Sequence, residues 1–172
     1  MNLLVAAGGD GLLRLSEWRG NAIYVKTILT AYRVSDLGRS LEFYEKFGFR
    51  EIGRVEFEGG SILVMLNLVG DGDAVAVELA YDPKIESVEV GNGFSHIAVQ
   101  VDNLESKLAD LAEKRVAFGE LQRPAGDNGP KTSFVHDPDG YRFELVEWPP
   151  GHPADMTRAD FLRAEPDQTG TS

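Results

Sequence analysis

The chain of 172 residues contains no cysteine, which excludes disulfides, cysteine nucleophiles and thiolate metal sites. Basic residues are also few, because 17 Lys and Arg stand against 28 Asp and Glu, giving a net charge of −11. That balance opposes binding to nucleic-acid phosphates and to anionic membrane surfaces. No apolar run reaches the length of a membrane span, and the first residues lack the basic region of a signal peptide. We therefore expect a cytoplasmic globular protein that binds neither nucleic acid nor membrane.

The hydrophobic periodicity predicts the same order of elements twice. The first set is a strand over 26–34, a helix from 37 that Gly48 ends, and strands over 49–58, 62–69 and 74–81. The second set is a strand over 94–101, a helix over 104–114, and strands over 116–121, 131–135 and 141–147. The run over 62–69 is so apolar that we expect it to be buried on both faces or nearly so.

Matching residues indicate an internal duplication. Val34, Leu37 and Leu41 recur as Val101, Leu104 and Leu108 with an offset of 67 residues, and Asp71, Asp73, Glu78 and Leu79 recur as Asp137, Asp139, Glu144 and Leu145 with an offset of 66. A repeat of this length determines the architecture. We predict an α+β fold in which two βαβββ modules, each with a curved mixed sheet, form a cleft between facing sheets.

The predicted domain covers residues 26–148, with modules over 26–82 and 93–148. Residues 1–25 show no clear period and are interpreted as an N-terminal extension that is loosely attached. Residues 149–172 form a C-terminal tail, because the two prolines that open it stop the preceding strand. Within the tail we expect a helical turn or two over 156–164 and disorder after 166.

Two glutamates and one histidine are the candidate functional residues. Glu78 and Glu144 each stand in the middle of an apolar strand, where a carboxylate must be solvated, paired or bound to a metal. One such residue most often faces solvent, but two at equivalent places of a repeat favour a shared site. His96, which alone would more often be a structural residue, joins them on a neighbouring strand, and imidazole with carboxylates is a usual shell for a divalent metal.

Four segments carry a resemblance to a known family. They are residues 32–37 (YRVSDL), 40–44 (SLEFY), 93–102 (GFSHIAVQVD) and 137–147 (DPDGYRFELVE). Together they resemble the vicinal-oxygen-chelate superfamily of glyoxalases, bleomycin resistance proteins and dioxygenases, over about residues 26–148. Within that superfamily, the nearest relatives look like glyoxalase I, or lactoylglutathione lyase.

The resemblance implies a metal shell of four protein ligands, two from each module. Glu78, His96 and Glu144 match three of these positions, but Leu29 occupies the fourth, and leucine cannot coordinate a metal. We therefore expect a divalent cation, Zn²⁺, Ni²⁺ or Mg²⁺, to be held weakly or not at all. The missing histidine also weakens the comparison with extradiol dioxygenases, which need two histidines and one glutamate.

The resemblance also implies an activity, the metal-dependent isomerisation of a thiol hemithioacetal of methylglyoxal. A glutamate removes the proton next to the carbonyl, with Glu144 as the first choice of base and Glu78 as the second. Arg33 matches a family residue that contacts the carboxylate of glutathione, although a surface salt bridge explains it equally well. Lys131 is a second candidate for substrate binding.

Three other functions fit the same fold, one of them non-enzymatic. A missing metal ligand and a charge of −11 favour a non-enzymatic protein of the antibiotic-binding type, whose degenerate metal site would leave an acidic cleft for a cationic or amphipathic ligand. The alternative enzymes are an epimerase or a thiol transferase that acts on an antibiotic. For all of these functions we expect a small-molecule ligand and a homodimer with the cleft near the subunit interface.

Overall fold

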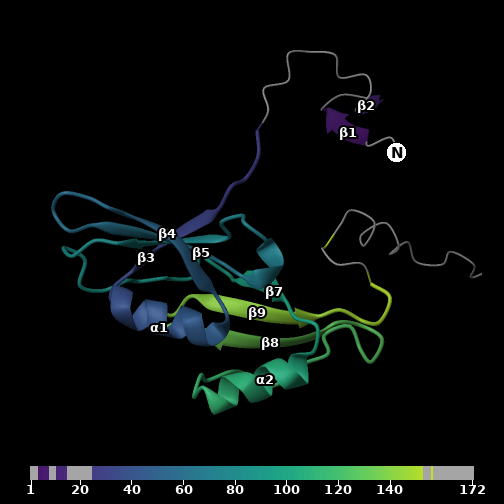
Figure 1. Cartoon of the computed structure of the whole chain (residues 1–172). Coiled ribbons are helices and arrows are strands. Elements are labelled where there is room, and N and C mark those ends of the chain that lie inside the picture. Colours follow the sequence, from purple (N-terminus) through teal and green to yellow (C-terminus); the bar gives the residue numbers. More distant parts are fainter. Residues whose placement is uncertain (1–3, 8–10, 15–24, 153–155, 157–172) are drawn as a thin grey trace, which may run out of the picture.

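The computed structural model describes residues 4–7, 11–14, 25–152 and 156 and contains two similar modules, each with a strand, a helix and then further strands (Figure 1). A two-stranded hairpin of β1 (Leu4–Ala7) and β2 (Gly11–Arg14) precedes them. The first module consists of β3 (Thr30–Val34), α1 (Leu37–Phe47), β4 (Arg50–Glu56), β5 (Ile62–Asn67), the 3₁₀ turn η2 (Val69–Asp71) and β6 (Val77–Tyr81). The second consists of β7 (Ile97–Gln100), α2 (Leu104–Glu113), β8 (Lys131–His136) and β9 (Arg142–Glu147).

The strand order confirms the predicted α+β repeat. The first sheet runs β3-β6-β5-β4 and the second runs β7-β9-β8, each with one parallel pair and antiparallel neighbours. The parallel pairs have the same register, since Ala31 lies opposite Glu78 in the first sheet and Ala98 lies opposite Glu144 in the second. Equivalent residues of the two modules therefore occupy equivalent places.

Two details of the predicted elements are wrong. The segment 116–121 forms no strand: Phe118 makes one isolated bridge to Val135, and Gln122, just after the segment, makes another to Thr132. Glycines and prolines are frequent from 119 to 130, and they interrupt the regular hydrogen bonding between strands. In β5, Val64 and Leu66 are buried, whereas Leu63 is only partly buried, so this strand is covered mainly on one face.

The helices begin and end where local side chains favour it. Asp36 caps α1 by accepting a hydrogen bond from the backbone N–H of Arg39 at 2.9 Å, and Asn103 caps α2 through the N–H of Ser106 at 2.7 Å. Gly48 ends α1 with a φ of 115°, in the left-handed region that favours glycine. These caps fix the helix that packs on each sheet.

Aromatic side chains join the two modules in one core. Tyr44 and Phe47 of α1 lie with their ring centroids 5.8 and 5.3 Å from the ring of Phe143 in β9. Further along β9, on the same face, Glu147 accepts a hydrogen bond from the N–H of Leu104 at the start of α2. Both helices therefore pack on one face of the second sheet, and Glu144 lies on the other face.

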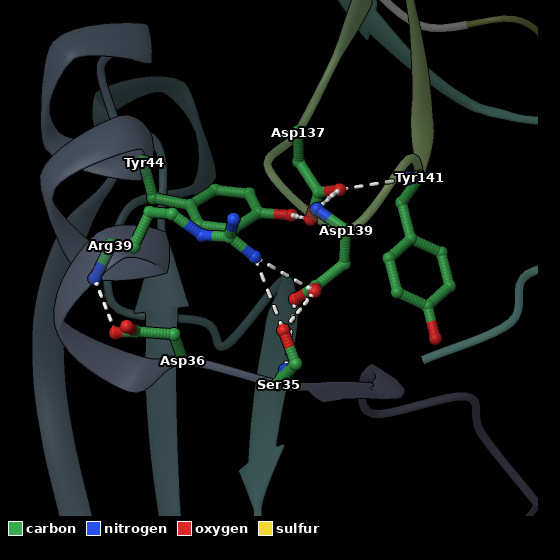
Figure 2. Close-up of polar contacts among 7 residues, drawn as sticks. All are labelled: Ser35, Asp36, Arg39, Tyr44, Asp137, Asp139 and Tyr141. Atoms are coloured by element: carbon green, nitrogen blue, oxygen red, sulfur yellow. Dashed lines mark hydrogen bonds and ion pairs between the residues drawn. The ribbon is translucent and has the colours of Figure 1, made fainter. Parts of the chain in front are cut away.

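A polar cluster joins the modules beside this core (Figure 2). Asp137 accepts hydrogen bonds from the hydroxyl of Tyr44 at 2.8 Å and from the N–H of Tyr141 at 2.8 Å. Asp139 accepts hydrogen bonds from the backbone N–H and the hydroxyl of Ser35 and from Arg39 at 3.2 Å. The turn before β9 is thereby held against the N-terminal end of α1.

Several expectations lie outside the described residues. Most of the predicted extension over 1–25, the helical turns over 156–164 and the disorder after 166 fall there. None of the helices within the described ranges is long and apolar enough to cross a membrane.

Candidate functional site

Each sheet has one face that the helices cover and one that they leave open. In the first sheet the covered face carries buried residues such as Tyr32, Val34 and Leu79. Side chains alternate along a strand, so Glu78 lies on the open face, and in the second sheet Glu144 does the same beside buried Phe143. The two glutamates predicted from the repeat thus occupy the same place in their modules.

On the second sheet, His96 and Glu144 are in direct contact. The Nε2 atom of His96 lies 3.1 Å from Oε2 of Glu144, with the two side chains 33 and 21 % exposed. The other ring nitrogen, Nδ1, lies 2.9 Å from the hydroxyl of Ser95. Hydrogen bonds at both nitrogens orient the imidazole, and the partly covered position limits the water around the carboxylate.

Two residues that the sequence patterns did not single out support this pair. Phe134 lies opposite Glu144 in the β8–β9 register, and its ring centroid is 6.0 Å from that of His96 in an edge-on arrangement. The guanidinium carbon of Arg142 lies over the ring of Phe134, 3.7 Å from its centroid. Alternation along β9 puts Arg142, two residues before Glu144, on the same face as the glutamate. Placing Phe134 there as well requires knowing how β8 pairs with β9.

We call His96, Ala98, Phe134 and Glu144 the second half-site, and their counterparts on the first sheet the first half-site: Leu29, Ala31, Met65 and Glu78. Met65 lies opposite Glu78 as Phe134 lies opposite Glu144. Each glutamate is therefore flanked by an alanine and by a larger apolar side chain. Leu29 precedes Ala31 by two residues, as His96 precedes Ala98, so it stands in the histidine's place.

The two remaining predicted residues lie apart from the second half-site. Arg33 is exposed on the open face of the first sheet, two residues from Ala31. Lys131 lies on the helix-covered face, because it is three residues from Phe134 and pairs with Glu147 at 2.8 Å and Glu105 at 3.0 Å. Both partners raise the pKa of Lys131, Glu147 first. Lys131 thus forms its ion pairs beside α2, on the face opposite His96 and Glu144.

A cavity of about 1180 Å³ opens beside the second half-site. His96, Glu144 and the length of β7 line it, together with Thr30 and Ala76 from the first module and Trp148 after β9. Glu78 is not among the described residues that line this cavity. A small molecule in the cavity would therefore meet the His96–Glu144 pair of the same chain.

Within the described part of one chain, the donor atoms do not complete a metal site. Two ligand atoms each about 2.1 Å from a metal lie about 3 Å apart, so the spacing between His96 and Glu144 suits two ligands. Glu78, however, is on the other sheet, and among the described residues no group of three His, Cys, Asp or Glu could hold a metal. The expected convergence of all three ligands does not occur within the described part of one chain.

Fold and site together define a class: proteins with two βαβββ-like modules that carry carboxylate and imidazole groups on the open faces of their sheets. The sequence pattern of the Glyoxalase/Bleomycin resistance protein/Dioxygenase superfamily matches residues 27–145, and the chain belongs to this superfamily.

Within this superfamily, the chain is similar to several proteins named lactoylglutathione lyase or glyoxalase I. The chain is 36 % identical over 130 residues to the lactoylglutathione lyase of Salmonella typhimurium, covering 72 % of this chain and 93 % of that protein. Glyoxalase I from Zea mays superposes with a TM-score of 0.61 at 26 % identity, over 70 % of this chain and 43 % of the maize chain, so this chain spans less than half of the maize protein. The trypanothione-dependent glyoxalase I of Leishmania major gives a TM-score of 0.57 at 27 % identity, over 72 and 87 % of the two chains.

Proposed function

We propose that this protein is a glyoxalase I-type isomerase that converts the hemithioacetal of methylglyoxal and a thiol into a thioester. The observation that carries the proposal is the contact between His96 and Glu144 on an open sheet face, beside a cavity large enough for such a substrate. The similarity to lactoylglutathione lyases, which extends over nearly their whole length in the Salmonella case, supports the same reaction.

In this proposal Glu144 is the base. Its carboxylate takes the proton from the carbon that bears sulfur and hydroxyl, and returns it to the neighbouring carbon that was the carbonyl. The hydroxyl proton moves to the other oxygen, so that a ketone next to a hemithioacetal becomes an alcohol next to a thioester, with no oxidant or reductant consumed. His96 orients the carboxylate through the 3.1 Å contact. Phe134 packs against the histidine ring and excludes water from that side.

We also propose a homodimer in which the first half-site of one subunit faces the second half-site of the other. This arrangement would bring Glu78 to His96 and Glu144, and it would cover the apolar side chains of Leu63 and Met65, which the helices leave open. A divalent cation held by these three donors would stabilise negative charge on the substrate oxygens. Glu78 is then a metal ligand and the second choice of base.

The remaining assignments concern the substrate and its surroundings. The thiol carries a carboxylate in this proposal, and Arg33 would bind it, since Arg33 is exposed on the open face of the first sheet. The whole site belongs to the glyoxalase-like domain over 26–148, and the protein works in the cytoplasm. A substrate of this class is a small molecule, in keeping with the family.

The test is a direct assay of thioester formation from methylglyoxal and glutathione. The protein is loaded in turn with Ni²⁺, Zn²⁺ and Mg²⁺, and Glu144→Gln is compared with Glu45→Gln, which changes an exposed glutamate of α1. We expect turnover by the wild type and by Glu45→Gln, and its loss in Glu144→Gln. Absence of turnover with all three metals would contradict the proposal.

A second function, binding of a small molecule without turnover, is favoured by one specific observation: Leu29 stands where the repeat would place a second histidine. The net charge of −11 suits a cationic or amphipathic ligand. Calorimetric titration of such ligands, with and without a chelator, separates the two functions. Tight binding that survives chelation, together with no isomerase activity, would favour the binding protein, whereas loss of binding on chelation would exclude it.

A further inference from the structure

The two half-sites differ at the one position that decides whether imidazole is available. Both modules place an alanine of the first strand opposite a glutamate of the last, and both place that glutamate beside a larger apolar side chain. In the second half-site His96 completes the arrangement and contacts Glu144. In the first, Leu29 stands two residues before Ala31, and no ion pair in the described residues includes Glu78.

We infer that Leu29 limits the affinity of this protein for a divalent cation, and that Leu29→His gives the first half-site the same His–Glu pair that the second one has. The inference rests on the proposed function for its choice of site. It nevertheless concerns metal binding alone, and the internal repeat supplies the geometry: the register that brings His96 to Glu144 is the register that relates residue 29 to Glu78.

The surroundings of Leu29 allow the substitution. Leu29 is half-buried and precedes β3, and the N–H of the next residue, Thr30, is held by the carbonyl of Ala76 at 3.1 Å. The backbone is thus anchored where the new side chain would start. Leu29 belongs neither to the buried core nor to the apolar residues packed against it, so the exchange leaves the packing of the modules intact.

The experiment measures metal affinity with Ni²⁺ and with Zn²⁺ as the probes, by calorimetry and by metal content after dialysis. Four proteins are compared: wild type, Leu29→His, Leu29→His with Glu78→Gln, and Ile28→His. Ile28 is 75 % exposed and adjacent, and alternation directs its side chain to the other side of the extended chain. It therefore controls for the mere addition of an imidazole. Circular dichroism and thermal unfolding show that every variant is folded.

We expect Leu29→His to bind the metal at least about tenfold more tightly than wild type, since the loss even of an outer-shell partner costs about 10- to 100-fold in affinity. The gain should vanish when Glu78→Gln is added and should be absent in Ile28→His. Equal affinities of Leu29→His and wild type, or an equal gain in Ile28→His, would overturn the inference. The isomerase assay of metal-loaded wild type is scored separately, so its failure would reject the proposed reaction and leave the metal result intact.

Discussion

The two modules share a fold but differ in what they place on it. Equal registers put Glu78 and Glu144 in corresponding positions, yet among the described residues a histidine contacts Glu144 and none contacts Glu78. The core differs as well, because Phe143 stands where the first module has Val77. Duplication thus preserved the backbone pairing, which depends on apolar alternation, and allowed individual side chains to diverge into a paired half-site and an unpaired one.

The largest difference that we predict between the modules is catalytic. Glu144→Gln should lower kcat about 10³-fold, because an amide cannot accept the proton. Glu78→Gln, which changes the equivalent position, should lower kcat/KM by only about tenfold, since in the proposed mechanism Glu144 takes the proton and Glu78 only helps to hold the cation. Thioester formation with saturating metal measures both. Equal losses in the two variants would show that the half-sites contribute alike.

The next effect concerns the core between the modules. Phe143→Ala should lower the free energy of unfolding by about 3 to 5 kcal/mol, because it leaves a cavity against the rings of Tyr44 and Phe47. Val77→Ala, at the equivalent place in the first module, removes a smaller side chain and should cost less. Urea unfolding measures both values. A smaller loss for Phe143→Ala than for Val77→Ala would contradict the role of Phe143 in joining the modules.

A third effect tests the polar junction of Figure 2. Asp137→Ala should cost about 2 kcal/mol of stability, because it leaves the buried hydroxyl of Tyr44 and the N–H of Tyr141 without their acceptor. Asp137→Asn keeps an acceptor oxygen and is the matched control, with a smaller loss. Urea unfolding near pH 7 measures both, and similar stabilities for Asp137→Ala and wild type would contradict the prediction.

The same junction predicts a pH dependence. Burial raises the pKa of Asp137 above its ordinary value, despite the hydrogen bonds from Tyr44 and the backbone, which lower it. The folded protein then holds this proton more tightly than the unfolded chain. The stabilisation is therefore complete below the unfolded pKa, about 3.9, and is lost as the pH rises through the folded pKa. Unfolding titrations of wild type and Asp137→Asn over that range should show wild type losing stability relative to the variant. An unchanged difference would contradict this linkage.

The smallest effect should come from Lys131. Lys131→Met removes partly exposed ion pairs to Glu105 and Glu147 on the helix-covered face, and ion pairs that water still reaches contribute about 1 kcal/mol or less. The KM for the hemithioacetal should not change, whereas Arg33→Met, on an open face, should raise it. Steady-state kinetics of the two variants measure both KM values. A raised KM for Lys131→Met would indicate that Lys131 does bind the substrate.

Much of the architecture could be predicted because alternation and turn residues are local signals. The helix over 37–47 ends at Gly48 as its left-handed conformation requires, and the turn that begins at Asp137 precedes β9. The segment 116–121 could not be predicted correctly, because its apolar residues resemble a strand while its bridges to β8 are isolated. Burial of one face of β5 also depended on which layer covers the sheet.

The residues of the candidate site also fall into two groups, those that the sequence could single out and those that it could not. The repeat and the family resemblance single out His96 and Glu144 as candidates, and the structure places their side chains 3.1 Å apart. Phe134 could not be identified, because its place beside Glu144 depends on how β8 pairs with β9, and the same pairing is needed to see that Arg142 stacks over its ring. Lys131 was predicted to bind substrate from its approximate place in the chain, but it stands three positions before Phe134 on the same strand and so lies on the opposite face.

The sequence by itself determined the duplication, the order of the elements, the exclusion of thiol chemistry and the presence of leucine where a second histidine would stand. These follow from local periodicity and from residue chemistry, which need no knowledge of distant contacts. Tertiary structure alone decided that both helices share one face of the second sheet, that His96 meets Glu144, and that Glu78 remains apart within one chain. Those relations depend on packing between segments far apart in sequence, and the energy of that packing is not encoded in any one segment.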